Sequence, residues 1–288
     1  MTQTAPVLLP PLDTPKAEPD DLRLWSVTTI IGVLDKPALL YWAAEQTALA
    51  AIHQQATWRG MLEDDAPGCT HEDADCAAVK WLRDARLRKR PGVRSATELG
   101  EAVHAACESY ALTGTRPEVD DEVRPFLDQF DRWLQRFSPS YQAAELTVYH
   151  PDLGYAGTAD AFLSIDGVRY IADYKTSRKA SSSGPYAEQV ALQLAAYRHA
   201  RFAAAWRARR YELWRRRYYL LSPSEQAMAV PVPEVDTGLV IKLTPESCEA
   251  YPVRCDEPVF EAYLAVQDAA RWVLQDSRQV LGEPLVRG

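Results

Sequence analysis

Residues 155–179 read YAGTADAFLSIDGVRYIADYKTSRK, and this stretch predicts two β-strands joined by a tight turn at Asp166-Gly167. Aspartate followed by glycine between largely apolar runs is the strongest short-range signal of a hairpin, because both residues tolerate the positive φ of a type I′ turn. If the loop consists of these two residues alone, Ile165 pairs with Val168. The stretch therefore predicts an antiparallel hairpin around which the rest of the chain is organised.

Two carboxylates oppose each other when this pairing is continued away from the turn. Counting back pairs Asp160 with Asp173, and directly opposed side chains lie about 5 Å apart at Cβ, where like charges repel. Lys175 follows Asp173 by two residues and so shares its face of the strand. A bulge or a longer loop would shift Asp160 off that face. In the regular register, the cluster favours a hard divalent cation such as Mg²⁺, which takes oxygen ligands and removes the repulsion.

Length, composition and charge place the chain among ordinary soluble globular proteins. Its 288 residues suffice for a sizeable core, and 47% hydrophobic and 25% charged residues are average values. With a net charge of −8, any binding of nucleic acid must depend on local basic patches. No apolar run is long enough to span a bilayer, and the N-terminus lacks the basic start of a secretory signal. We therefore expect a cytoplasmic protein that does not associate with membranes.

The periodicity of the chain predicts an α/β (or α+β) protein, with a mixed β-sheet core flanked by helices. Residues 1–21, rich in proline and acidic side chains, are expected to form a flexible arm, and residues 22–140 a lobe of several helices that includes a helix at 95–114. Residues 141–280 are expected to form the core. In it we expect strands at 144–150, 156–165, 168–176, 218–221 and 239–243 and helices at 186–210 and 257–274.

Four short motifs follow one another along these elements. They are a G-x-x-x-H pattern at Gly100 and His104, GTAD ending at Asp160, DYKT with Asp173 and Lys175, and QLAAY with Gln193 and Tyr197. In this order the motifs resemble those of the RecB-like branch of the PD-(D/E)XK nucleases. Residues 26–44, SVTTIIGVLDKPALLYWAA, are similar to phage and actinobacterial exonucleases of that branch, which are related to the CRISPR-associated RecB-like nucleases. The resemblance covers roughly residues 24–270.

The resemblance implies a restriction-endonuclease-like fold and a metal-dependent DNA exonuclease of phage or bacterial recombination or repair. It implies that His104, Asp160, Asp173 and the backbone carbonyl of Tyr174 bind one or two Mg²⁺ or Mn²⁺ ions, which polarise the phosphate and activate water. The implied partners are linear DNA, including single-stranded ends, and a single-strand annealing or recombination protein. For a phage-encoded protein the compartment would be the host cytoplasm.

The resemblance also assigns roles to three further side chains. Lys175 would orient or deprotonate the attacking water and stabilise charge on the phosphate, while Gln193 and Tyr197 would contact the lysine and DNA near the scissile bond. Independently, the i, i+4 spacing lets Gln193 and Tyr197 reach one point from a helix. A helix face that merely packs on the sheet is the alternative for this pair, and an ordinary ion pair is the alternative for Lys175.

Basic runs provide candidate contacts to DNA. Arginines are concentrated at 83–94 and 201–217, with tryptophan and tyrosine between them in the second run. Guanidinium groups hold phosphates, and aromatic rings stack on splayed bases. We expect DNA contacts from four basic residues, Arg178, Lys179, Arg209 and Arg210. Ordinary solvated helix faces are the alternative for the arginine runs.

Two further side chains have open alternatives. His104 is either a metal ligand or a structural histidine, and its Gly-x-x-x-His context favours the ligand. Glu145, ahead of the hairpin, is either an acid close to the site or a solvated strand end.

The cysteines argue against a bound cluster. CRISPR-associated relatives hold an iron–sulfur cluster with one N-terminal and three C-terminal cysteines. Here Cys69 and Cys76 are separated by six residues, as are Cys248 and Cys255, and no C-x-x-C occurs. We therefore expect free thiols rather than an iron–sulfur cluster or the zinc site that His71 makes conceivable.

Two other functions are compatible with the same motifs. One is a CRISPR spacer-acquisition nuclease that carries an iron–sulfur cluster. The other is a non-catalytic DNA-binding member of the superfamily, and the complete set of Asp160, Asp173 and Lys175 argues against it.

Overall fold

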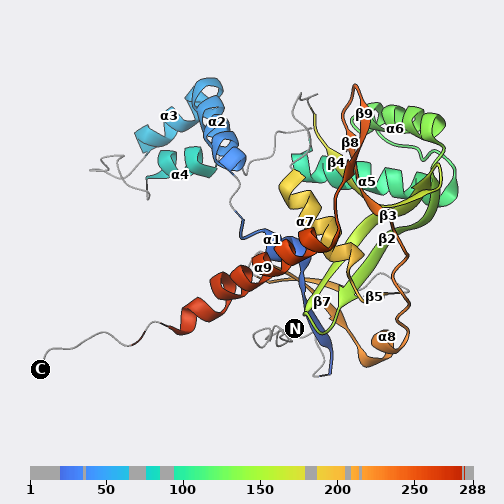
Figure 1. Cartoon of the computed structure of the whole chain (residues 1–288). Helices are drawn as coiled ribbons and strands as arrows, with labels where there is room; N and C mark the ends of the chain where they lie inside the picture. Colours follow the sequence, from blue (N-terminus) through green and yellow to red (C-terminus); the bar gives the residue numbers. More distant parts are fainter. Residues whose placement is uncertain are drawn as a thin grey trace, which may run out of the picture. The chain divides into compact units, whose positions relative to one another are not determined.

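The computed structural model describes residues 20–34, 37–64, 76–84, 94–178, 187–204, 209–213, 216–280 and 282. The chain divides into two units (Figure 1). Met1–Leu34 and Ala96–Gly288 form the sheet unit, and Asp35–Ser95 form the helical unit. The helical unit contains α2 (Pro37–His53), α3 (Gln55–Asp64) and α4 (Ala77–Arg83), which pack on one another. α2 begins at Pro37, as expected from the fixed φ of proline in a first helical turn.

One mixed β-sheet, with nine strands among the described residues, is the frame of the sheet unit. Its main path runs through β6 (Arg209–Leu213), β7 (Arg216–Leu221), β1 (Leu22–Ser26), β3 (Tyr155–Ile165), β4 (Val168–Thr176), β8 (Thr237–Leu243) and β9 (Cys248–Val253). β2 (Ser140–His150) pairs with β3, and the short β5 (Phe202–Ala203) pairs with β2. The β1–β3 and β4–β8 pairs are parallel, and the other pairs are antiparallel. The predicted fold class, a mixed sheet flanked by helices, is confirmed.

The predicted hairpin is confirmed at its turn. β3 and β4 are joined by Asp166 and Gly167, with φ of 50° and 84°, as a type I′ turn requires. Ile165 pairs with Val168, and the ladder continues regularly from there. The local sequence therefore set the register as expected.

Helices cover both faces of the sheet (Figure 1). α1 (Val27–Ile31), α7 (Ala187–Arg198) and α9 (Glu257–Leu274) share one apolar cluster with the sheet, whereas α5 (Ala96–Thr113) and α6 (Arg124–Phe137) share another. Two short elements, α8 (Pro223–Ala227) and the 3₁₀ turn Asp276–Gln279, complete the unit. None of the described helices is long and apolar enough to cross a bilayer.

Four elements differ from the sequence-based expectation. α5 and α6 pack on the sheet and belong to its unit, although the sequence grouped residues 22–140 as one helical lobe. β1 is a strand, although its sequence carries no clear strand signal. Its pairing with β3 and β7 stabilises it. α7 ends at Arg198, so the predicted helix over 186–210 is too long, and Arg209 and Arg210 lie in β6. Pairing of β6 with β7 overrides the helix propensity of this arginine- and alanine-rich run.

Candidate active site

Strands β3 and β4 separate at Asp160, and the site is built at this point. Their recorded pairing runs from Ile165–Val168 to Ala161–Ala172 and stops one position short of Asp160 and Asp173. Beyond it, the Asp160 carboxylate takes over the role of a backbone acceptor, because its Oδ2 accepts a hydrogen bond of 2.7 Å from the Tyr174 N–H. β4 meanwhile continues its parallel pairing with β8 through Thr176. The side chain of Asp160 is therefore held against the start of the D-Y-K segment.

The Asp173 carboxylate is engaged on both of its oxygens. Gln193 Nε2 donates to Oδ1 at 2.9 Å, and Lys175 Nζ forms an ion pair with Oδ2 at 2.6 Å. The same amide nitrogen of Gln193 lies 3.3 Å from the Tyr197 hydroxyl. Asp173 and Lys175 thus share a face of β4, as predicted, and the predicted i, i+4 pair of α7 reaches one point beside them.

His104 approaches Asp160 from the other layer of helices. Its Nδ1 lies 3.6 Å from Asp160 Oδ2, and its ring packs edge-on against the Tyr174 ring, with 5.8 Å between the centroids. Gly100 lies one turn earlier on α5, and a Cβ there would come 3.2 Å from Thr176 Oγ1. The G-x-x-x-H motif is therefore explained physically, because the missing side chain lets α5 approach the end of β4 closely enough to present His104.

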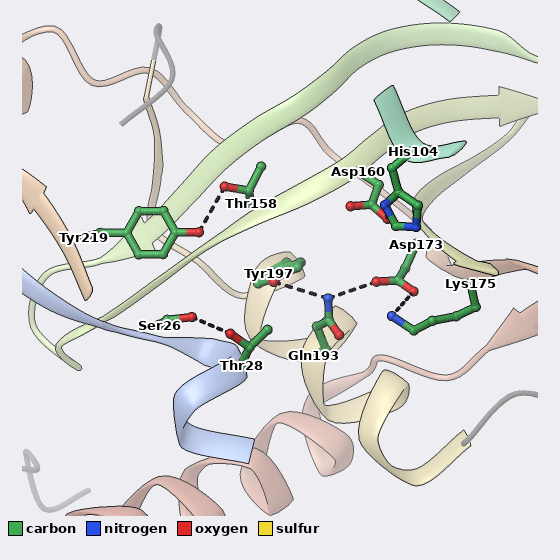
Figure 2. A pocket seen from close by; sticks show the side chains of 10 residues that line it. All are labelled: Ser26, Thr28, His104, Thr158, Asp160, Asp173, Lys175, Gln193, Tyr197 and Tyr219. Carbon is green, nitrogen blue, oxygen red and sulfur yellow. Dashed lines mark hydrogen bonds and ion pairs between the residues drawn. The ribbon is translucent and has the colours of Figure 1, made fainter. Parts of the chain in front are cut away.

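These side chains surround a cavity of about 220 Å³ (Figure 2). α7 supplies Gln193 and Tyr197 on one wall, while β3 and β4 supply the acids on another. The complete lining is Ser26, Thr28, His104, Thr158, Asp160, Asp173, Lys175, Gln193, Tyr197 and Tyr219. Every predicted catalytic side chain, together with His104, is therefore brought to a single cavity.

Burial and mutual charge set the protonation of the site. Burial raises the pKa of Asp160 well above its usual value, and the charge of Asp173 raises it further. Burial by itself would lower the pKa of Lys175, but the attraction of Asp173 outweighs this effect and the pKa is raised. Burial lowers the pKa of His104. At neutral pH the site therefore holds an ammonium at Lys175 and a neutral imidazole at His104, which keeps a lone pair for a cation.

The donor set suits a divalent cation, but its members are not arranged around one. Two neighbouring buried carboxylates and a neutral imidazole are donors that Mg²⁺ or Mn²⁺ accepts. Asp173 Oδ2 is buried, and Lys175 Nζ forms an ion pair with it at 2.6 Å. Within the described ranges, no three His, Cys, Asp or Glu side chains are already grouped as metal ligands. In this arrangement the ammonium of Lys175 is the cation beside Asp173.

Tyr174 presents two different surfaces to the site. Its backbone N–H binds Asp160, whereas its side chain is buried in the apolar layer beneath α5 and α6, where its hydroxyl lies 3.1 Å from that of Tyr141. The role of its carbonyl as a metal ligand stays a prediction.

Gly157 of the GTAD motif is required by the packing of Tyr197. A Cβ at this position would lie 2.1 Å from Tyr197 Cε1 and 2.8 Å from its hydroxyl oxygen. Tyr197 is itself only 3% exposed, so its ring has little room to move away. The glycine thus allows the helix wall of the cavity to lie directly on β3.

We expect Gly157→Ala to lower the free energy of unfolding by about 1–3 kcal/mol, because the added methyl group displaces the buried Tyr197 ring. Urea denaturation of each variant measures this loss. In a Tyr197→Leu background the same substitution should cost less, since the overlapping ring atoms are absent. Gly60→Ala is the control, because a Cβ on Gly60 of α3 meets nothing within 4 Å. Equal losses for Gly157→Ala in both backgrounds would contradict this explanation.

A row of hydroxyl groups lines the end of the cavity away from Lys175, and the sequence analysis named none of its members as a site residue. Ser26 Oγ lies 2.7 Å from Thr28 Oγ1, and Thr158 Oγ1 lies 3.0 Å from the Tyr219 hydroxyl (Figure 2). Ser26 occupies the N-cap position of α1, but its side chain makes no capping hydrogen bond. Nothing in the sequence indicated that Tyr219 belongs to the site, because only the pairing of β7 with β1 brings it to the cavity.

Of the four basic residues predicted to contact DNA, the structure describes three, and these lie in different parts of the sheet unit. Arg178 follows β4 and pairs with Glu122 at 2.7 Å, with 41% of its side chain exposed. Arg209 and Arg210 belong to the edge strand β6, and Arg210 is the register partner of Tyr219. Lys179 lies outside the described residues. Their binding to DNA stays a prediction.

None of the four cysteines that the structure describes is joined in a disulfide bond. Cys107, Cys248 and Cys255 belong to the sheet unit, and Cys76 belongs to the helical unit. Cys69 and His71 lie outside the described residues. Burial raises the pKa of the Cys107 thiol well above its usual value and that of Cys248 to about 12, so both are protonated at neutral pH.

Comparisons with known proteins leave the family open. No protein-family model matches the chain, and no curated protein is similar to it. Among solved structures, the chain is similar to one described as the crystal structure of SSO0001, with 14% sequence identity and a TM-score of 0.29 over 65% of this chain and 79% of that one. Similarity at this level does not establish a common fold, so the function must be inferred from the site itself.

Proposed function

We propose that this protein is a metal-dependent DNA exonuclease that hydrolyses phosphodiester bonds. The observation that supports it most is the convergence of Asp160, Asp173 and Lys175 with Gln193 on one cavity, with His104 beside Asp160. Two adjacent carboxylates with a lysine and a neutral imidazole form an arrangement suited to phosphoryl chemistry, in which positioning and charge stabilisation supply most of the catalysis. Recombination or repair of phage or bacterial DNA is the proposed setting.

The proposed cofactor is Mg²⁺ or Mn²⁺, held by Asp160, Asp173 and His104. When bound, such an ion polarises a phosphate oxygen and lowers the pKa of a coordinated water. Asp160 is fixed for this role by the Tyr174 N–H, and Asp173 is fixed by the Gln193 amide.

Lys175 acts in this proposal mainly through its charge. Its raised pKa keeps it an ammonium, 40% of its side chain is exposed, and it lines the cavity. A protonated lysine donates hydrogen bonds and cannot accept a proton from water. The role supported best is therefore to orient the attacking water and to stabilise negative charge on the phosphate, rather than to deprotonate water as a general base.

The test is degradation of end-labelled DNA by protein freed of metal with EDTA. Linear single- and double-stranded DNA should be degraded from an end once Mg²⁺ or Mn²⁺ is added, and a closed circle should resist. Asp160→Asn should lower the rate by about 1000-fold, because it removes one charged ligand. The matched control is Asp166→Asn at the tip of the same hairpin, where asparagine also suits the turn.

Three results would count against the proposal. If the wild type leaves all linear DNA intact with both ions, the protein is not a nuclease on DNA. If the circle is cut as fast as the linear form, the enzyme is an endonuclease. If Asp160→Asn is as active as Asp166→Asn, the activity arises elsewhere.

A further inference from the structure

Glu145 lies directly opposite Asp160 on the neighbouring strand. β2 pairs with β3 through Ala144–Ala161 on one side and Leu146–Ala159 on the other, so the intervening residues Glu145 and Asp160 face each other. No ladder pair is recorded between them, although the register is the same before and after. The sheet therefore brings a third carboxylic acid next to Asp160, on the side away from Asp173.

The backbone of Glu145 is in a left-handed conformation, with φ of 49°. Two other non-glycine residues in the described part of the chain share this sign of φ. Ser138 ends α6, and Asp166 is in the hairpin turn, where left-handed residues are ordinary. Glu145 instead lies within a strand and without an inserted residue, so it is not a bulge. Such strain in a non-glycine residue is uncommon, and it is concentrated at functional sites.

The negative charge of Glu145 acts on His104 and on Asp160, two residues of the proposed metal site. Burial dominates the pKa of His104 and of Asp160, and Glu145 raises both to a smaller extent. α5, which carries His104, packs on β2 as well as on β3 and β4. Glu145 is not among the residues that line the cavity, so we expect it to make no direct contact with a substrate.

We propose that Glu145 is a positioning residue, which holds His104 and Asp160 in the orientation that binds the divalent ion. This inference rests on the proposed metal-dependent function. Carboxylates behind a metal-binding histidine commonly fix its ring and its tautomer. The left-handed backbone of Glu145 is then the local cost of placing a carboxylate at this point, because a residue in regular extended conformation would leave the strand in a different direction.

The decisive experiment separates metal binding from stability. Mn²⁺ binding to EDTA-treated protein is measured by calorimetry for the wild type, Glu145→Gln and Glu145→Gly, together with the melting temperature of each metal-free protein. We expect the affinity for Mn²⁺ to fall about tenfold in both variants. The melting temperature of Glu145→Gly should stay level or rise by about 1–4 °C, because glycine accepts a positive φ without strain.

Ser138→Gly is the matched control, since it relieves a left-handed residue of nearly the same φ at the end of α6. It should leave the affinity for Mn²⁺ unchanged. If either Glu145 variant binds Mn²⁺ within about twofold of the wild type, the inference about Glu145 is overturned, whatever the melting temperature shows. If the wild type binds no Mn²⁺, the inference fails together with the proposed function, and this outcome is distinct from the first.

Discussion

Asp173→Asn is expected to lower the rate of DNA cleavage by about 1000-fold or more. Both oxygens of Asp173 face donors, the amide of Gln193 and the ammonium of Lys175. Asparagine has nearly the same shape but offers one acceptor oxygen and one N–H₂ group, so one of the two donors must face another donor. The substitution also removes a charged ligand from the proposed metal site. Single-turnover cleavage of end-labelled DNA in Mg²⁺ measures the effect.

The fold of this variant must be verified, because Asp173 is buried. Circular dichroism and the melting temperature show whether it is folded under the assay conditions. Asp166→Asn is again the control, because it makes the same chemical change at the other end of the hairpin. A rate within about fivefold of the wild type would show that Asp173 is not in the catalytic site.

For Lys175→Met we expect a different combination, a rate lowered by about 100- to 10,000-fold with divalent-ion affinity equal to the wild type or higher. Methionine keeps the length of the side chain and removes the charge. The ammonium now lies 2.6 Å from Asp173 Oδ2, so it competes for the oxygen that a metal ion would take. Without it, the repulsion between Asp160 and Asp173 is relieved by a bound ion or by a proton on Asp160, whose pKa is already raised. Mn²⁺ should therefore raise the melting temperature of this variant more than that of the wild type.

Lys242→Met provides the matched control for a loss of positive charge. Lys242 is the register partner of Lys175 on β8 and is buried, but it does not line the cavity. Its replacement should leave the cleavage rate near that of the wild type at a temperature at which both variants are folded. If the two lysine variants are equally slow, the effect comes from general charge rather than from the contact with Asp173. If Lys175→Met loses its affinity for Mn²⁺, the idea of competition is wrong.

The site could be predicted from the sequence where its parts are local. Asp166-Gly167 fixes the turn, and the count from it places Asp160 near Asp173 through a ladder of five pairs. The spacing of Gln193 and Tyr197 predicts their meeting, because one helical turn separates them. Gly100 and His104 likewise depend on a single helix. Each of these relations spans few residues, so short-range geometry is enough to determine it.

Other parts of the site depend on contacts between distant segments. The hydroxyl wall requires β1, β3 and β7 to lie side by side, and residues 26, 158 and 219 have no short-range relation. The left-handed backbone of Glu145 also leaves no sign in the composition of β2, since glutamate is neither a turn residue nor a glycine. The predicted helix over 186–210 is too long because it takes no account of a distant partner. The pairing of β6 with β7 outweighs the local helix propensity of residues 209–213.

The sequence by itself determined the hairpin, its register and the identity of the acids, lysine and histidine that meet beside it. The hairpin, its register and the placement of the two acids with Lys175 follow from turn chemistry and strand periodicity, whereas His104 was indicated only by the resemblance of its motif. Only the tertiary structure decided where β3 and β4 separate, which hydroxyl groups close the cavity, and that Glu145 lies opposite Asp160 on the neighbouring strand. These depend on long-range strand pairing and on the close approach of Tyr197 to Gly157, whose energies arise between segments that no local pattern connects.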